Sequence, residues 1–191
     1  MVIGIFGKSG SGKSTVCAYL KEKGFYLIDA DKLGHNILKK GEEGYRKVIE
    51  AFGRSFLEEN GEINRKKLGK YVFENNKADI LSSISHPIID RIVENEIKNS
   101  QNSNNNTVID GALLCNTRIK DMCDIMILIK SDYCARRIEI RDSIPKEEAE
   151  NRLNSQKIAD TADIIIENNG TIDELLNKTD EVLRKEIPDY E

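Results

Sequence analysis

The chain has 191 residues, which suits one α/β domain with a sizeable core and, at most, a small inserted subdomain. With 39% hydrophobic and 32% charged residues, its composition excludes the disordered and membrane classes, and no apolar stretch approaches the roughly 18 residues of a membrane-spanning helix. The formal net charge of −4 argues against broad binding to nucleic acid or to an anionic membrane, so a phosphate ligand requires a local pocket.

The amino-terminal residues lack the basic start, long apolar segment and cleavage site of a signal peptide. No C-x-x-C spacing occurs, and the cysteines are interpreted as reduced packing residues. These are Cys17, Cys115, Cys123 and Cys134. We therefore expect a cytoplasmic protein with no nucleic-acid, membrane or obligate protein partner.

A glycine-rich loop follows the first apolar run. Residues 7–15 read Gly-Lys-Ser-Gly-Ser-Gly-Lys-Ser-Thr, a complete G-x-x-x-x-G-K-[ST] motif between a predicted strand, Val2–Phe6, and a helix expected from about Lys13 to Lys23. Such a loop lets backbone N–H groups converge on nucleotide phosphates, with Lys13 near the β- and γ-phosphates and the Ser14 hydroxyl placed to ligate Mg²⁺. The predicted nucleotide-binding residues are Gly7, Lys8, Ser9, Gly10, Ser11, Gly12, Lys13, Ser14 and Thr15.

Apolar, β-rich runs recur along the chain, mostly with helical patterns between them. They are Val2–Phe6, Phe25–Ile28, Thr107–Ile109, Ile125–Ile129 and Ile164–Ile166. This alternation predicts an α/β fold, a doubly wound five-stranded parallel sheet of the P-loop NTPase type, with ligands beyond the carboxyl ends of the strands.

Two carboxylates follow the second predicted strand. Asp29 and Asp31 would face the same crevice as the phosphate-binding loop, where one of them could receive a proton from an attacking hydroxyl. Either could instead cap a helix starting near Lys32. Strand-end geometry favours Asp31 for catalysis.

Residues 41–99 show helical patterns and no convincing central strand. The expected helices are Glu42–Phe52, Lys66–Glu74, Lys77–Ser85 and His86–Lys98. The segment is too long for an ordinary crossover and is interpreted as an inserted helical subdomain that closes over a substrate, with a merely decorative helical layer as the alternative. The core then comprises about residues 1–40 and 107–191, and the polar segment Ser100–Asn106 is expected to be a solvent loop.

Two features of this insert need an interpretation. Asn76-Lys77-Ala78-Asp79 matches the N-K-x-D pattern that reads guanine in GTP-binding switches, but it lies between helical segments, so Asn76 is interpreted as a helix N-cap. His86 precedes Pro87, with Ser85 a possible cap of a new helix, and both a structural role and a ligand role for His86 remain open. Neither histidine of the chain belongs to a metal-ligand cluster.

The third predicted strand ends on a carboxylate, Asp110, the pattern through which P-loop enzymes hold Mg²⁺, often through water. A plain strand-end turn residue is the alternative.

Beyond the fourth strand, Arg137 and Arg141 share one helical face because of their i,i+4 spacing, and they could neutralise transferring phosphates. The alternative is an exposed face balanced by Glu139 and Asp142. Pro145–Asn154 suits a charged helix of a lid that would span about residues 136–157.

Nearly end to end, the sequence resembles the dephospho-CoA kinase family, a P-loop nucleotide-kinase-like group. The stretches that carry the resemblance include Gly10–Thr15, Ile28–Asp31, His86-Pro87, Val108–Leu114, Arg137–Asp142, Arg152–Gln156 and Ala162–Gly170. The resemblance implies phosphorylation of the ribose 3′-hydroxyl of dephospho-CoA by ATP with Mg²⁺, the last step of coenzyme A biosynthesis. The alternative hypotheses are a nucleoside or nucleoside-monophosphate kinase on this fold and a P-loop switch ATPase.

The resemblance also implies roles for individual residues. Asp31 would be the base and Arg141, with Arg137, would act with Lys13 in catalysis. The backbone near Asn168, Asn169 and Gly170 would lie where the family holds adenine. The acceptor-binding residues would be Asp31, Arg65, His86, Pro87, Leu113 and Leu114.

The chain departs from the family at three places: His35, Asn116 and the short stretch 157–161. These departures leave some acceptor and lid contacts unassigned.

Overall fold

The computed structural model describes residues 1–103, 105–112, 114–158, 161–187 and 190. Its described residues form two compact units. Residues 1–29 and 96–191 make up the first unit, and residues 30–95 make up the second.

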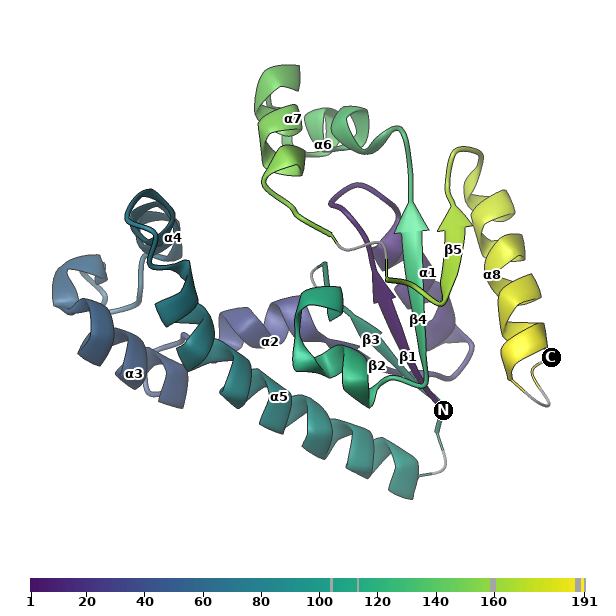
Figure 1. The fold of residues 1–191 in the computed structure, drawn as a ribbon, viewed down its shortest axis with the longest axis horizontal. Coiled ribbons are helices and arrows are strands. Elements are labelled where there is room, and N and C mark those ends of the chain that lie inside the picture. Colours follow the sequence, from purple (N-terminus) through teal and green to yellow (C-terminus); the bar gives the residue numbers. More distant parts are fainter. Residues whose placement is uncertain (104, 113, 159–160, 188–189, 191) are drawn as a thin grey trace. The chain divides into compact units, whose positions relative to one another are not determined.

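A five-stranded sheet forms the centre of the first unit (Figure 1). The strands are β1 Val2–Phe6, β2 Tyr26–Asp29, β3 Thr107–Asp110, β4 Ile125–Lys130 and β5 Ile164–Glu167. All neighbours pair in parallel, in the order β2-β3-β1-β4-β5. The predicted fold class is confirmed, and each predicted strand matches its observed counterpart to within one residue at each end.

The helices that lie wholly in this unit are α1 Lys13–Glu22, α6 Cys134–Asp142, α7 Lys146–Asn154 and α8 Ile172–Glu186, with short 3-10 turns η2 Leu114–Asn116 and η3 Arg118–Met122. Helices α1 and α8 pack on the sheet, whereas α6 and α7 pack on each other beyond the end of β4 (Figure 1). Helix α8 begins at a capping box in which Thr171 and Glu174 satisfy each other's backbone N–H groups. The helix patterns predicted after the first and fourth strands are thereby confirmed.

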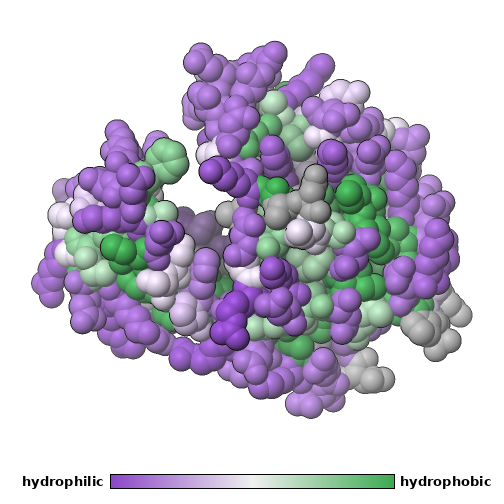
Figure 2. Space-filling view, viewed as in Figure 1, coloured by the Kyte–Doolittle hydropathy of each residue, from purple (hydrophilic) through white to green (hydrophobic). Residues whose placement is uncertain are grey.

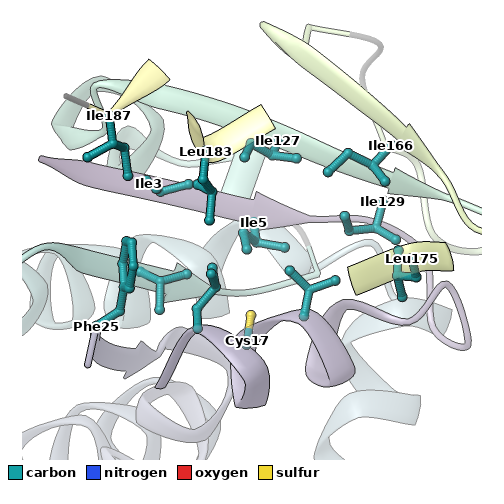
Figure 3. Packing of buried hydrophobic residues seen from close by; sticks show 13 residues of the cluster. Ile3, Ile5, Cys17, Phe25, Ile127, Ile129, Ile166, Leu175, Leu183 and Ile187 are labelled. Carbon is teal, nitrogen blue, oxygen red and sulfur yellow. The ribbon is translucent and has the colours of Figure 1, made fainter. Parts of the chain in front are cut away.

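Burial of alternate strand residues beneath α1 and α8 builds the main core (Figure 3). Ile3 and Ile5 of β1 lie with Ile127 and Ile129 of β4 in one fully buried cluster. Successive side chains of a strand point to opposite faces, so this spacing of two places all four on the face that α1 and α8 cover. The central strand that leads to the glycine-rich loop is therefore held rigidly.

The second unit is helical and has its own core. It contains α2 Ala30–Asn36, α3 Glu43–Phe52, η1 Arg54–Phe56, α4 Arg65–Glu74 and most of α5 Ala78–Asn102, which continues into the first unit. Val48, Phe56, Leu68 and Val72 are buried together in this unit. Its amphipathic helices thus bury their apolar faces against one another.

Helix α5 corrects three predictions. The helices expected at Lys77–Ser85 and His86–Lys98 are one helix that runs through Pro87, so Ser85 caps nothing. The predicted loop Ser100–Asn106 is wrong at its start, because Ser100 is buried in this helix and accepts a hydrogen bond from the Thr107 hydroxyl at 2.7 Å. A proline restricts the residue before it but does not oblige a helix to end there.

Asn76 is not the N-cap of α5. The N–H of Leu81 donates to the carbonyl of Lys77, so the helix starts one residue later than an Asn76 cap requires. Asn76 instead adopts a left-handed turn conformation, with φ 52°, between α4 and α5. This location between two helices differs from the strand end that a guanine-reading motif needs.

Hydrophilic side chains dominate the face of the molecule that Figure 2 shows. Among the described residues, no helix combines the length and the apolar character needed to cross a membrane. All four cysteines are free, in agreement with the interpretation of reduced packing residues.

Candidate active site

The glycine-rich loop follows β1, which lies between β3 and β4 in the sheet. Helix α1 begins at Lys13, within the motif. Gly7, Gly10 and Gly12 have φ values of 149°, 78° and 104°, a region that L side chains rarely adopt. Space is equally restrictive, because a Cβ on Gly10 would lie 2.7 Å from the carbonyl oxygen of Cys134. The loop conformation therefore requires these glycines, as the motif predicted.

Lys13 is only 9% exposed although it carries a charge. Burial of an ammonium group costs free energy unless an anion or hydrogen bonds compensate it. Lys13 is also the first residue of α1, whose amino-terminal N–H groups attract anions. Together these features make the loop a site for a phosphate group, with Ser14 exposed on the first turn of the helix.

Asp110 and Asp29 end neighbouring strands in the same register. Asp110 is also paired with Ile5 of β1, two residues before Gly7. The buried Cys17 thiol interacts with Asp110 by a hydrogen bond, and burial, together with the negative charge of Asp110, raises the pKa of this thiol. The structure thus places a carboxylate on the strand beside the loop.

Ser14 and Asp110 supply hard oxygen donors of the kind that Mg²⁺ prefers. No group of three or more His, Cys, Asp or Glu side chains suited to a metal occurs among the residues that the structure describes. Magnesium in kinases is usually held by one or two protein oxygens, substrate phosphates and water. The donor set therefore fits a magnesium ion bound together with a nucleotide.

Two of the three arginines of α6, Arg137 and Arg141, reach the loop. Arg137 donates from Nη1 to the carbonyl oxygen of Gly10 at 3.2 Å. Arg141 donates from Nη2 to the Ser9 hydroxyl at 3.3 Å, and it also forms an ion pair with Asp142. Hydrogen bonds from Arg141 lower the pKa of Asp142. Arg141 therefore contacts the loop and is also balanced by a neighbouring carboxylate, so the structure is consistent with both interpretations of this helix.

The segment after α7 contributes a side chain that sequence reasoning did not single out. Gln156 accepts a hydrogen bond at its Oε1 from the Ser9 N–H, over 2.9 Å. Helix α7 itself packs Ala149 and Leu153 against the buried face of α6. The predicted charged helix at Pro145–Asn154 is confirmed, and its continuation reaches the phosphate-binding loop.

The loop after β5 holds two asparagines in different settings. Asn169 is exposed and forms two hydrogen bonds with Asp132. Its Nδ2 donates to the Asp132 carboxylate at 2.8 Å, and its Oδ1 accepts from the Asp132 N–H at 3.0 Å. Asn168 is buried and donates to the carbonyl oxygen of Ser11 at 2.7 Å. Asn168 was predicted only as part of the adenine region, and its contact with the phosphate-binding loop was missed.

A cavity of about 190 Å³ adjoins the loop within the first unit. Its lining residues are Lys8, Ser11, Leu128, Ile129, Lys130, Ser131, Cys134 and Ile158.

The predicted acceptor residues fall into separate groups. Asp31 is exposed in the first turn of α2, Arg65 begins α4, and His86 and Pro87 are exposed within α5, all in the second unit. Leu114 is buried in η2 of the first unit. Leu113 lies outside the described residues. The structure thus places the residues of the predicted phosphate-binding loop within one unit, and both the nucleotide-binding and the acceptor roles stay predictions.

Comparison with known proteins shows the family to which the chain belongs. The family model described as dephospho-CoA kinase matches residues 1–174. The chain belongs to the dephospho-CoA kinase family. A dephospho-CoA kinase of Fusobacterium nucleatum is 37% identical over 187 residues, which cover 94% of this chain and 95% of the relative. One of Oryza sativa is 36% identical, over 96% of this chain and 83% of the relative.

Solved structures support the same assignment. TT1252 from Thermus thermophilus superposes with a TM-score of 0.82 and 25% identity, covering 98% of both chains. A dephospho-CoA kinase from Campylobacter jejuni has a TM-score of 0.69 and 25% identity, covering 96% of both chains. The dephospho-CoA kinase fold is therefore present over almost the whole length.

Proposed function

We propose that this protein catalyses the ATP-dependent phosphorylation of the ribose 3′-hydroxyl of dephospho-CoA, which gives CoA and ADP in the last step of coenzyme A biosynthesis. The observation that carries the proposal is the family match over residues 1–174, with an intact phosphate-binding loop at its start. The enzyme is thus a phosphotransferase with an alcohol group as acceptor.

Phosphoryl transfer needs little covalent chemistry from the protein, so alignment and charge stabilisation are its main tasks. Backbone N–H groups of residues 7–15 would hold the phosphates, and the buried Lys13 would neutralise charge on the transferring group. Arg141 would assist once a nucleotide occupies the loop, and its contact with the Ser9 hydroxyl supports this role. Arg137 contacts the loop backbone from the same helix.

A magnesium ion would supply further charge neutralisation between the phosphates. Ser14 and Asp110 are the residues proposed to hold it, because their oxygens match its preference and Asp110 lies on the strand beside β1.

Asp31 is the proposed base that orients the attacking 3′-hydroxyl and accepts its proton. The proposed acceptor site comprises Arg65, His86, Pro87, Leu113 and Leu114, and Asn169 is assigned to the adenine region. Support for these roles is their match to the family motifs.

The decisive experiment is incubation of the purified protein with ATP, Mg²⁺ and dephospho-CoA, followed by mass detection of CoA and ADP. Nucleosides and nucleoside monophosphates, supplied in parallel as acceptors, distinguish the proposed activity from a nucleoside or nucleotide kinase. Preferential phosphorylation of one of these would replace the proposed acceptor. ATP hydrolysis with no phosphorylated acceptor would instead favour a switch ATPase.

A cytoplasmic location is part of the proposal. The free cysteines support it, since disulfides are rare in reducing compartments.

A further inference from the structure

Two carbonyl oxygens of the phosphate-binding loop, those of Gly10 and Ser11, accept hydrogen bonds from side chains outside the loop. Asn168 donates from Nδ2 to the carbonyl oxygen of Ser11 at 2.7 Å. Arg137 donates from Nη1 to the carbonyl oxygen of Gly10 at 3.2 Å and makes a longer contact of 3.5 Å with that of Ser11. Two donors therefore converge on the Ser11 carbonyl.

Asn168 is itself fixed in place. Its N–H donates to the carbonyl oxygen of Lys130 at the end of β4, over 2.8 Å, and its own carbonyl accepts from Arg137 Nη2 at 3.3 Å. Only 6% of the residue is exposed, so water does not compete effectively for its amide. A Cβ on Gly12 would collide with this amide, which explains how glycine at position 12 allows the close approach.

Fixing the Ser11 carbonyl also fixes the next N–H. The structure contains no cis peptide bond among its described residues, and in a trans peptide the carbonyl and the N–H point in opposite directions. Because the Ser11 oxygen faces Asn168, the N–H of Gly12 faces away from it. Gly12 directly precedes α1, so this N–H belongs to the group of amino-terminal donors that binds anions.

We propose that Asn168 is a positioning residue which, together with Arg137, holds the Ser11–Gly12 peptide so that the Gly12 N–H points at the nucleotide phosphates. A glycine accepts both signs of φ, so a loop rich in glycine gives little resistance to rotation of this peptide. Rotation would turn a carbonyl oxygen toward the phosphates and repel them. The inference rests on the proposed nucleotide site and assigns Asn168 to the phosphates rather than to adenine.

The test is Asn168→Leu, a side chain of similar branched shape that lacks the donor and adds no charge. The Kd for ADP should rise at least tenfold, whereas the Kd for adenosine and the KM for dephospho-CoA should stay within twofold. A matched control is Asn106→Leu. Half-buried Asn106 accepts a hydrogen bond from the amino-terminal ammonium group and precedes β3, at the amino-terminal ends of the strands and away from the loop. The control should keep all three constants within twofold of the wild-type values.

Equal losses of ADP and adenosine affinity in Asn168→Leu would overturn the inference in favour of an adenine contact, and unchanged ADP affinity would overturn it outright. If wild-type protein does not bind ADP, the nucleotide site fails and the inference fails with it. Should Asn168→Leu not fold, wild-type NMR decides the question. A scalar coupling across the hydrogen bond between Asn168 Nδ2 and the Ser11 carbonyl carbon supports the inference, and its absence contradicts it.

Discussion

The two carboxylates that follow β2 occupy different structural settings. Asp29 ends the strand in register with Asp110, whereas Asp31 lies exposed in the first turn of α2. Asp29, and not Asp31, is the residue at the end of the strand. The assignment of the base to Asp31 therefore depends on the family motif. Substitution of each residue separates the two possibilities.

We expect Asp31→Asn to lower kcat by about a hundredfold or more, because general base catalysis commonly contributes that much. The Kd for ADP should change less than twofold, since the substitution keeps the shape of the side chain and leaves the loop intact. Steady-state kinetics and calorimetric ADP binding measure both effects. A collapse of kcat in Asp29→Asn with a fully active Asp31→Asn would transfer the role of base to Asp29.

At the level of single residues, sequence could predict the groups that belong to a local motif. The loop glycines, Lys13 and the i,i+4 pair on α6 required only spacing within one segment. The contact of Gln156 with Ser9 and that of Asn168 with Ser11 join residues separated by 147 and 157 positions. Nothing in the local pattern marks such partners, because the strand order of the sheet brings them together.

Helices α1 and α8 are joined by a partly buried polar contact near the carboxyl-terminal end of the chain. The hydroxyls of Tyr19 and Tyr190 both donate to Asp180, at 2.8 Å and 2.7 Å. Burial opposes ionisation of Asp180, but these hydrogen bonds and the charge of Lys23 outweigh it and lower its pKa. The ionised carboxylate therefore stabilises the packing of the two helices.

This arrangement predicts a pH dependence. Because the folded pKa of Asp180 is below its unfolded value of about 3.9, its contribution is present above that pH and is lost as the pH falls through the folded pKa. Urea unfolding at pH 6 and at successively lower values down to about 3 should show a smaller acid-induced loss in Asp180→Asn than in the wild type. Identical losses in both proteins would show that Asp180 does not contribute.

At the level of elements, strands were easier to predict than helix boundaries. The five strands of the parallel sheet read as short continuous apolar runs, which flanking polar residues delimit. The inner strands β1, β3 and β4 are largely buried, whereas β2 and β5 at the sheet edges are partly exposed. The predicted helix boundary at His86-Pro87 was wrong, because α5 continues through this proline. Ser100 looked like part of a polar loop, yet its hydroxyl is satisfied by Thr107 in the interior, a contact that composition does not reveal.

On the scale of the whole molecule, the residues of the proposed nucleotide site lie within one of two compact units. The loop, Lys13, Asp110 and the arginines of α6 all belong to the unit formed by residues 1–29 and 96–191. A nucleotide that binds there should stabilise the folded state by mass action, even when no acceptor is present.

Saturation with MgADP at about 100 times its Kd should stabilise the wild type by about 2.7 kcal/mol. For a chain of this size, that gain corresponds to a rise in Tm of roughly 5–10 °C. Lys13→Ala should show little or no rise, because the loss of its ammonium group weakens phosphate binding. Differential scanning calorimetry measures both values, and a full shift in Lys13→Ala would contradict the assignment of the loop.

Burial of the cysteines lowers their reactivity, which matters for an enzyme whose product, CoA, carries a thiol group. Burial raises the pKa of Cys17 and Cys134, and it raises that of Cys123 to about 12, so at neutral pH all three remain protonated. Only thiolates attack disulfides at useful rates. These three side chains are therefore poor partners for mixed-disulfide formation with oxidised forms of the product.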